Sequence, residues 1–248
     1  MTFIRKILLF CFLSTMFACT GLRNKDVKVK ETIVQISTNY GEMYMELSDK
    51  TPLHKANFIK LVKENYYDSL LFHRVINRFM IQGGDPDSKN APLAKRLGNG
   101  GPGYTIPAEF DTTLYHRKGA VAAARMPDNG NPKKASSGSQ FYIVQGRPMD
   151  MKQLKNIESS KKRGNPNFSY SQEQLEVYST IGGYPPLDGD YTVFGQIIKG
   201  MDVIDKIAVV ETRNKRKEDR PTSDVMMTMK LVLVSAEEKQ KLVLNESK

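Results

Sequence analysis

The sequence of 248 residues has no tryptophan and only two cysteines, Cys11 and Cys19, which both lie in its first nineteen residues. The chain beyond Cys19 therefore contains neither a disulfide nor a thiolate metal site. Its three histidines (His54, His73 and His116) are far apart, without the spacing of a zinc or copper site. It also lacks a phosphate-binding loop, a dinucleotide fingerprint and a serine in a nucleophile elbow. These absences argue against an ordinary hydrolase or oxidoreductase, and we expect no cofactor and no metal.

Acidic residues are the minority charge, because 37 Lys and Arg against 27 Asp and Glu leave a net charge of +10. Such an excess fits an anionic partner or only a soluble basic surface. Basic runs such as residues 215–217 lack the interleaved aromatic side chains that stack on bases, so we expect solvated loops and no nucleic-acid partner.

Long apolar runs are missing as well, apart from one near the N-terminus. Arg5 and Lys6 precede an almost purely apolar run over residues 7–17. That run is shorter than the roughly 20 residues that span a bilayer, and it is typical of an export signal. We therefore predict a signal peptide over residues 1–18; a short N-terminal helix of a cytosolic protein is the alternative.

The end of this leader, Met16-Phe17-Ala18-Cys19, resembles a lipobox, in which a peptidase cuts before a lipid-modified cysteine. Cys19 is the expected lipidation site, and the polar residues 19–31 are expected to tether the folded body to a membrane. The prediction is an exported bacterial lipoprotein of the cell envelope, at the periplasmic face or the outer membrane.

From Thr32 the chain shows strand and helix patterns. Thr51-Pro52 is a typical helix start, and we expect that helix to run to about Asn65. Antiparallel strands, two flanking helices and long glycine-rich loops indicate a mainly β fold, a closed β-barrel capped by two helices. The expected elements are strands at 33–36, 43–47, 70–75, 79–82, 119–124, 140–144, 191–198 and 225–234, with a second helix at 201–208.

Residues 147–184 interrupt this rhythm and are interpreted as an insertion. The stretch is rich in lysine and then contains SYSQEQLEVYSTIG, which predicts an amphipathic helix with Leu175 and Tyr178 on one side. The folded body is expected to end near residue 236, followed by a charged C-terminal tail over residues 237–248.

Three further segments stand out: the first crowds a charge, amides and large apolar residues in expected β structure, and the second places a glutamine beside aromatic residues on a strand. Residues 72–85, FHRVINRFMIQGGD, place Arg74 near Phe72 and Phe79; residues 138–143 read GSQFYI, and residues 187–195 read LDGDYTVFG. An arginine on such a strand is often a surface residue with a buried stem.

Taken together, these segments resemble the cyclophilin family of peptidyl-prolyl cis-trans isomerases. Residues 72–85 match the family pattern F-H-R-[VI]-[IV]-x-x-F-M-[IVC]-Q-G-G-D, and the other two segments follow in the family's order. The stretch GGPGYTIPAEF at 100–110 is similar to the bacterial branch. The resemblance covers residues 32 to about 234 apart from the insertion, and it implies a closed antiparallel eight-stranded β-barrel over residues 32–236.

The resemblance also implies roles for single residues. Arg74 corresponds to the catalytic arginine, which would stabilise the twisted amide. Pro186 and Tyr191 replace a Trp or Phe and a His of the family pocket, which puts binding of cyclosporin-class inhibitors in doubt. The residues expected to bind substrate are Phe79, Met80, Gln82, Ala124, Arg125, Gln140, Tyr142, Leu187 and Tyr191.

Two functions of different classes follow from this resemblance. The first is an isomerase that accelerates X-Pro rotation in exported proteins, with proline-containing peptides and unfolded chains as partners and a monomeric state. The second is a non-catalytic module that binds proline peptides or partly folded chains on the same scaffold. The insertion bears on the choice, because over the pocket it would restrict substrates, and outside the barrel it would recruit a partner.

Overall fold

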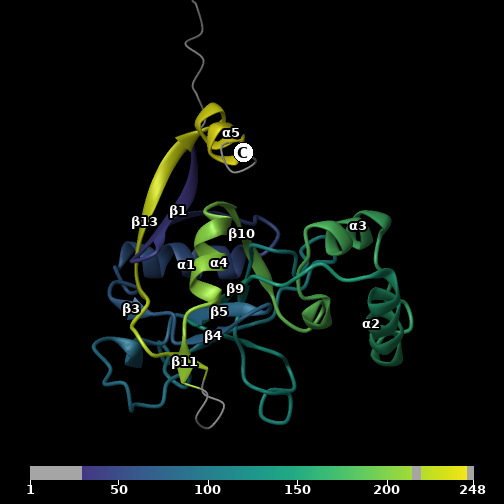
Figure 1. Ribbon diagram of the computed structural model, residues 1–248, viewed down its shortest axis with the longest axis horizontal. Coiled ribbons are helices and arrows are strands. Elements are labelled where there is room, and N and C mark those ends of the chain that lie inside the picture. The colour runs from purple at the N-terminus through teal and green to yellow at the C-terminus, as the bar shows by residue number, and fades with distance from the viewer. Residues whose placement is uncertain (1–29, 214–218, 245–248) are drawn as a thin grey trace, which may run out of the picture.

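A computed structural model describes residues 30–213 and 219–244 of the chain (Figure 1). The predicted signal peptide 1–18, Cys19 and nearly all of the predicted tether lie outside the described residues. The described chain forms a curled antiparallel sheet with helices packed against it, and the 147–184 insertion forms a helical lobe at one side.

Alternating apolar residues build the sheet. The first two strands are joined by the turn Asn39-Tyr40, with Thr38 opposite Gly41. Within the described residues the main sheet has nine strands, in the order β3-β13-β1-β2-β10-β7-β9-β5-β4. Their bounds are β1 Lys30–Thr38, β2 Gly41–Leu47, β3 Leu70–Leu71, β4 Arg74–Ile76, β5 Met80–Gly83, β7 Ala120–Ala123, β9 Phe141–Val144, β10 Val193–Lys199 and β13 Met226–Ser235.

The prediction of a closed eight-stranded barrel is wrong in two respects, because the main sheet of the described residues has nine strands and its ladder is open between β3 and β4. The sequence predicts one strand over 70–75, but Phe72 and His73 separate two short strands there. β3 pairs with β13 at one edge of the sheet, and β4 pairs with β5 at the other edge. The chain therefore joins the two edges covalently where a closed barrel would join them by hydrogen bonds.

Two helices pack into the main core as predicted. Helix α1 (Pro52–Lys63) begins with Pro52 in its first turn, and α4 (Met201–Ala208) follows the left-handed Gly200. Their buried faces belong to the same apolar cluster as the strand residues; these helix residues are Phe58, Leu61, Val62, Val203, Ile204, Ile207 and Ala208. Burial of a large apolar side chain contributes about 1.5–3 kcal/mol, so these faces hold both helices to the sheet.

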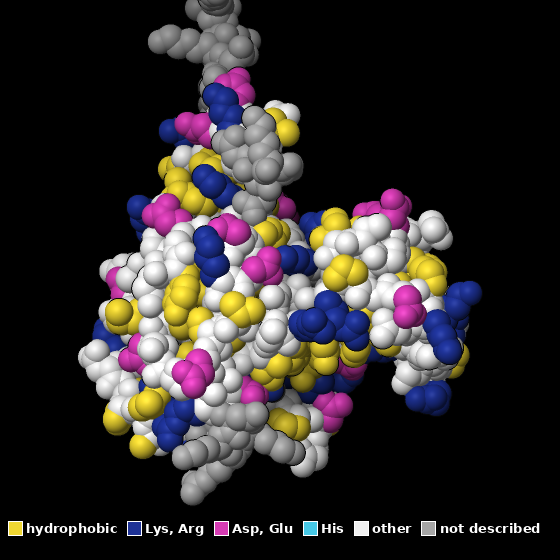
Figure 2. Space-filling view, viewed as in Figure 1, with side chains coloured by type: hydrophobic (Ala, Val, Ile, Leu, Met, Phe, Trp, Pro, Cys, Tyr) yellow, Lys and Arg dark blue, Asp and Glu magenta, His cyan; other side chains and the backbone are white. Residues whose placement is uncertain are grey.

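The insertion contains two helices, α2 (Met151–Gly164) and α3 (Gln172–Thr180), which both begin with a capping box. The predicted amphipathic helix is confirmed, with Tyr178 fully buried. The lobe has its own small core, centred on Tyr115, Met149, Leu154, Tyr170 and Tyr178. Its ends meet, because the backbones of Arg147 and Gly183 exchange two hydrogen bonds of 3.3 Å. On the face shown in Figure 2, Lys and Arg side chains lie along the outer edge of this lobe.

At the two ends of the body the structure differs from the sequence prediction. Lys30 and Glu31, predicted as tether, begin β1, and residues 237–244 of the predicted tail belong to helix α5 (Ala236–Leu244). Lys239 of α5 lies 2.7 Å from Glu31 and 2.8 Å from Glu46, and Leu242 packs on the sheet, so α5 lies beside the start of β1 (Figure 1). Within residues 30–213 and 219–244, no helix is both long and apolar enough to cross a membrane.

The remaining elements are short and belong to the loops. The pairs β6 with β8 and β11 with β12 form two small sheets, and two 3₁₀ helices, η1 and η2, lie near the candidate site. Their bounds are β6 Thr105–Ile106, β8 Ser136–Ser137, β11 Thr212–Arg213, β12 Arg220–Pro221, η1 Pro86–Ser88 and η2 Pro185–Leu187.

Candidate active site

Arg74 is positioned by the pairing of the edge strand β4 with β5. β4 and β5 place it directly opposite Gln82, and its Nη1 donates a hydrogen bond of 3.3 Å to Gln82 Oε1. On its other side, Arg74 Nε lies 3.5 Å from the carboxylate of Asp219. The side chain is still 40% exposed, so the oriented guanidinium can meet a ligand.

A chain of hydrogen bonds fixes the amides next to this arginine. Gln82 Nε2 donates to Gln140 Oε1 over 3.2 Å, and Gln140 Nε2 donates to the carbonyl of Gly100 over 2.8 Å. The loop that carries Gly100 is held by the buried carboxylate of Asp85, which accepts from the backbone N–H of Gly98 at 2.5 Å. The sequence Gln82-Gly83-Gly84-Asp85 thus supplies both an amide beside Arg74 and the anchor of the loop above it.

Close contacts require glycine at position 84 of this motif and at position 100 of the loop that Asp85 holds. Gly84 has φ +88°, and a Cβ added to it would lie 2.2 Å from the carbonyl oxygen of Ser139. A Cβ on Gly100 would lie 2.1 Å from Asp85 Oδ1. Any larger residue would separate the strands or displace the Asp85 anchor.

Beside Arg74 lies a pocket with a volume of about 250 Å³. Phe79 packs on Tyr184 with ring centroids 4.1 Å apart, and Tyr142 meets Tyr191 edge to face at 5.9 Å. Of the ten predicted active-site residues, nine line the pocket: Arg74, Phe79, Met80, Gln82, Ala124, Arg125, Tyr142, Leu187 and Tyr191. The tenth, Gln140, does not line it but bonds to Gln82 behind the rim.

Arg125 forms part of the rim in a fixed position. Its Nε donates to the carbonyl of Asp190 at 2.7 Å, and its Nη1 donates to Asp128 at 2.5 Å. The guanidinium carbon lies 4.5 Å from the centroid of the Tyr191 ring, a cation–π contact. Arg125 therefore holds the Tyr191 wall, a role that its place in the sequence did not indicate.

The pocket also contains His73, Leu97 and Gly98, which the sequence analysis did not select. His73 is 4% exposed, and among the described residues neither of its ring nitrogens has a hydrogen-bond partner. Burial lowers the pKa of His73 from its usual 6.5 to about 4, so the ring is neutral at physiological pH. Its place between Phe72 and Arg74 in the sequence motif was the signal that could have identified it.

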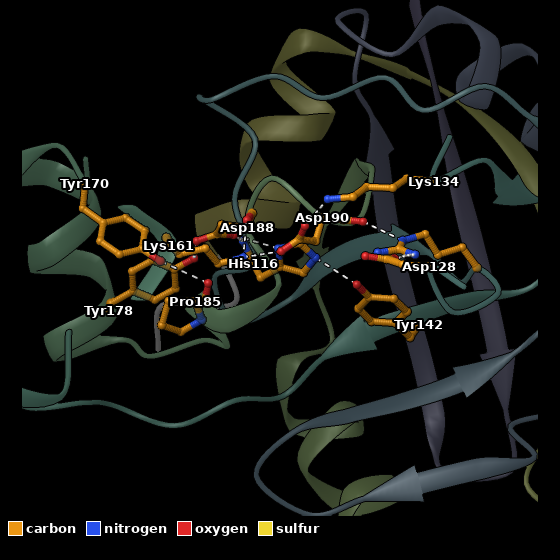
Figure 3. Close-up of polar contacts among 11 residues, drawn as sticks. His116, Asp128, Lys134, Tyr142, Lys161, Tyr170, Tyr178, Pro185, Asp188 and Asp190 are labelled. Carbon is orange, nitrogen blue, oxygen red and sulfur yellow. Dashed lines mark hydrogen bonds and ion pairs between the residues drawn. The ribbon is translucent and has the colours of Figure 1, made fainter. Parts of the chain in front are cut away.

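The insertion does not cover the pocket, since no residue of 147–184 is among the side chains that line it. The insertion lies behind the part of the pocket wall that Tyr142 forms, and buried polar residues there contact Tyr142. His116 Nε2 lies 2.9 Å from the Tyr142 hydroxyl, and His116 Nδ1 lies 2.7 Å from Asp188 (Figure 3). The sequence analysis considered His116 only as a metal ligand, because nothing local shows that it meets residues 26 and 72 positions away.

The arrangement offers a cation, amides and an apolar cavity side by side. In the described part of the chain, His, Cys, Asp and Glu side chains form no group of three that could hold a metal ion. The Arg74 guanidinium can stabilise electron density on a group held in the cavity, and Phe79, Met80 and Leu187 offer that group apolar surface.

Comparison with known proteins agrees with this geometry. The model of the family described as cyclophilin type peptidyl-prolyl cis-trans isomerase/CLD matches residues 33–231. A Staphylococcus epidermidis protein named as a peptidyl-prolyl cis-trans isomerase is 34% identical over 208 residues, covering 82% of this chain and 93% of that protein. A Streptococcus pyogenes protein named as a bifunctional phosphatase/peptidyl-prolyl cis-trans isomerase is 36% identical over 210 residues, 78% of this chain. The matched region spans 37% of that longer relative.

A solved structure shows the same fold. The crystal structure of a Cryptosporidium parvum cyclophilin type peptidyl-prolyl cis-trans isomerase, determined in the presence of the dipeptide Ala-Pro, aligns with a TM-score of 0.54 at 24% identity. The alignment covers 82% of this chain and 99% of that one. With a family match over most of its length, the chain belongs to the cyclophilin-type peptidyl-prolyl cis-trans isomerases.

Proposed function

We propose that this protein accelerates rotation about X-Pro peptide bonds with Arg74 as its catalytic residue. The observation that carries the proposal is the convergence of the Arg74 guanidinium, the Gln82 amide and the apolar side chains of a pocket of about 250 Å³ in one site. The Cryptosporidium relative crystallised with Ala-Pro supports a proline residue as the occupant of that cavity.

The reaction requires no bond to be made or broken. Resonance gives the peptide C–N bond double-bond character, and the barrier to its rotation is about 18–20 kcal/mol. Uncatalysed X-Pro exchange therefore takes tens to hundreds of seconds. A catalyst needs to stabilise the twisted amide more than either planar form.

Arg74 meets this requirement through charge. When the amide twists, conjugation is lost and the proline nitrogen becomes pyramidal with a localised lone pair. A guanidinium donor directed at that nitrogen stabilises the twisted state and has no such lone pair to bind in the planar states. Gln82 and Asp219 hold the guanidinium in place before the substrate arrives.

The rest of the pocket restrains the substrate. Phe79, Met80, Tyr142 and Leu187 enclose the proline ring, while Gln82 and Gln140 present amides to the neighbouring backbone. Ala124 and Arg125 lie where the residue before proline would pass. With both sides of the bond held, rotation is confined to the target peptide bond.

The proposed setting is the bacterial cell envelope. The leader 1–18 and the lipobox ending at Cys19 support export and lipid attachment, and the clients would be newly exported chains that contain proline. An enzyme body without cysteine works in oxidising and reducing surroundings alike.

A protease-coupled isomerisation assay with a series of proline tetrapeptides tests the activity. The purified protein should exceed thermal exchange, and Arg74→Ala should lower kcat/KM by about 10²–10³, as does removal of one oxyanion donor. A wild-type rate equal to thermal exchange would contradict the proposal.

A further inference from the structure

The insertion is connected to the proline pocket by buried polar contacts. Tyr178 of α3 donates its hydroxyl hydrogen to Asp188 Oδ2 over 2.5 Å, and Asp188 Oδ1 accepts from His116 Nδ1 at 2.7 Å. Because the Asp188 carboxylate only accepts, His116 carries a proton on Nδ1, and its Nε2 lies 2.9 Å from the Tyr142 hydroxyl. Figure 3 shows this series running from the insertion to the pocket wall.

All members of this series are buried. Tyr178 and His116 are 0% exposed, Tyr142 is 4% exposed and Asp188 is 7% exposed. A buried carboxylate is unfavourable unless each of its oxygens is hydrogen-bonded, and Asp188 also accepts from the His116 backbone N–H at 2.8 Å. Removing one donor to Asp188 therefore leaves a buried carboxylate oxygen without that hydrogen bond, which disturbs the other contacts of the series as well.

The polar contacts of the insertion converge on one loop. Tyr170 donates to the carbonyl of Pro185 at 3.0 Å, and Lys161 donates to the carbonyl of Asp188 at 2.6 Å and to the carboxylate of Asp190 at 2.5 Å. This loop, residues 185–191, carries Leu187 and Tyr191 into the pocket. Two helices of the insertion thus hold the loop that forms one wall of the site.

We propose that the 147–184 insertion positions the proline pocket from behind, and that Tyr178 is a positioning residue for the reaction. It acts through Asp188 and His116 on Tyr142, and through the 185–191 loop on Leu187 and Tyr191. This inference rests on the proposed isomerase function, and it gives the insertion a role other than a lid or a partner-binding lobe.

The wall contacts a proline ring in the planar and the twisted states alike. Loosening it removes binding that is uniform along the reaction, which raises KM and leaves kcat nearly unchanged. Loss of Arg74 acts on the twisted state and lowers kcat. The two kinds of residue are therefore distinguished by which constant changes.

Tyr178→Phe and Tyr115→Phe form a matched pair for the test. Their rings lie 5.4 Å apart in the same cluster, and each substitution removes one buried hydroxyl. Tyr178 bonds to Asp188, whereas the Tyr115 hydroxyl has no partner among the described residues. KM and kcat for a proline tetrapeptide are measured for both variants, along with their thermal unfolding.

We expect Tyr178→Phe to raise KM about 3–10-fold with kcat within about twofold of wild type, and Tyr115→Phe to change neither. Equal KM values for wild type and Tyr178→Phe would overturn the inference. An inactive wild type would instead overturn the proposed function. Asp188→Asn is a stronger variant for the same series, and Tyr178→Phe decides the question if that variant does not fold.

Discussion

At the scale of residues, Arg74 depends on its neighbours for its direction. A free arginine side chain samples many rotamers, and ordering it costs up to about 2 kcal/mol of entropy. Here the contacts with Gln82 and Asp219 offset that entropy in the folded state, because they hold two different nitrogens of the guanidinium. The sequence motif predicted Arg74 and Gln82 as site residues, and the structure places both in one pocket. Asp219, 145 positions after Arg74, became visible only in the fold.

Gln82→Ala should therefore lower activity although Gln82 carries no charge. A hydrogen bond to a charged group contributes about 1.5–3 kcal/mol, so we expect kcat/KM to fall roughly 10–100-fold, less than for Arg74→Ala. Gln35→Ala is the control, because the Gln35 amide bonds to Glu42 on the β1–β2 pair, away from the pocket. Equal rates for Gln82→Ala and wild type would show that Arg74 is oriented without it.

His73 predicts a pH effect on stability. Burial lowers the pKa of His73 from 6.5 to about 4, so between pH 6.5 and about 4 this histidine is protonated in the unfolded chain but neutral in the folded chain. The free energy of unfolding is therefore unaffected by His73 above pH 6.5. It decreases by about 1.4 kcal/mol for each pH unit as the pH falls from 6.5 to about 4.

Urea unfolding of wild type and His73→Gln between pH 7.5 and 4.5 measures this contribution. The free energy of unfolding should fall more steeply with decreasing pH in wild type, by roughly 2–3 kcal/mol over the range. Parallel curves for the two proteins would mean that His73 accepts a proton in the folded state.

At the scale of elements, the local sequence pattern was sufficient to predict a helix where neighbouring residues alone determine it. The helix start at Thr51-Pro52 and the helix at 201–208 were both predicted from the sequence and are confirmed. The charged stretch after residue 236 was predicted as a tail. In the structure it contains helix α5, and Lys239 of that helix reaches Glu31 and Glu46 on strands far away in the sequence.

Whether the sheet closes and where the insertion lies could not be predicted from local pattern either, because both depend on contacts between residues far apart in the sequence. Residues 70–75 alternate like one strand, yet β3 and β4 lie at opposite edges of the sheet. The insertion was recognised from its composition, but its contact with Asp188 depends on Tyr178 meeting a loop that follows it after a chain reversal.

Neighbouring lysines of α2 test the contact between the insertion and the loop. Lys161 bonds to Asp188 and Asp190 and is 15% exposed, whereas Lys162 pairs with Glu158 on the same helix and is 46% exposed. We expect Lys161→Met to raise KM about 2–5-fold and Lys162→Met to leave it unchanged, because an exposed pair contributes at most about 1 kcal/mol. Equal effects would mean that the loop does not depend on α2.

At the scale of the whole molecule, the pocket and the start of the described chain belong to separate parts of the surface. β1 begins beside α5, while Arg74 lies on the edge strand β4 (Figure 1). A membrane anchor attached before β1 would leave the pocket open to a passing chain. This arrangement suits a protein that acts on clients beside a membrane.

Cys19→Ser tests the proposed anchor. Several acyl chains give durable membrane attachment where one does not, so wild type expressed in a bacterium should fractionate with membranes and incorporate labelled palmitate. The variant should lose the label, and its processing by the lipoprotein peptidase should stop. Labelling that persists in Cys19→Ser would contradict the assignment of Cys19.

Exchange NMR on a proline peptide tests the central claim most directly, because it observes binding and isomerisation in the same sample. With catalytic amounts of wild type, cis–trans exchange peaks should appear within a mixing time far shorter than thermal exchange. Arg74→Ala should still shift the backbone signals of Ala124 and Tyr142 on peptide addition but produce no exchange peaks. Peptide binding by wild type without exchange peaks would contradict the account and identify a proline-binding module on an isomerase scaffold.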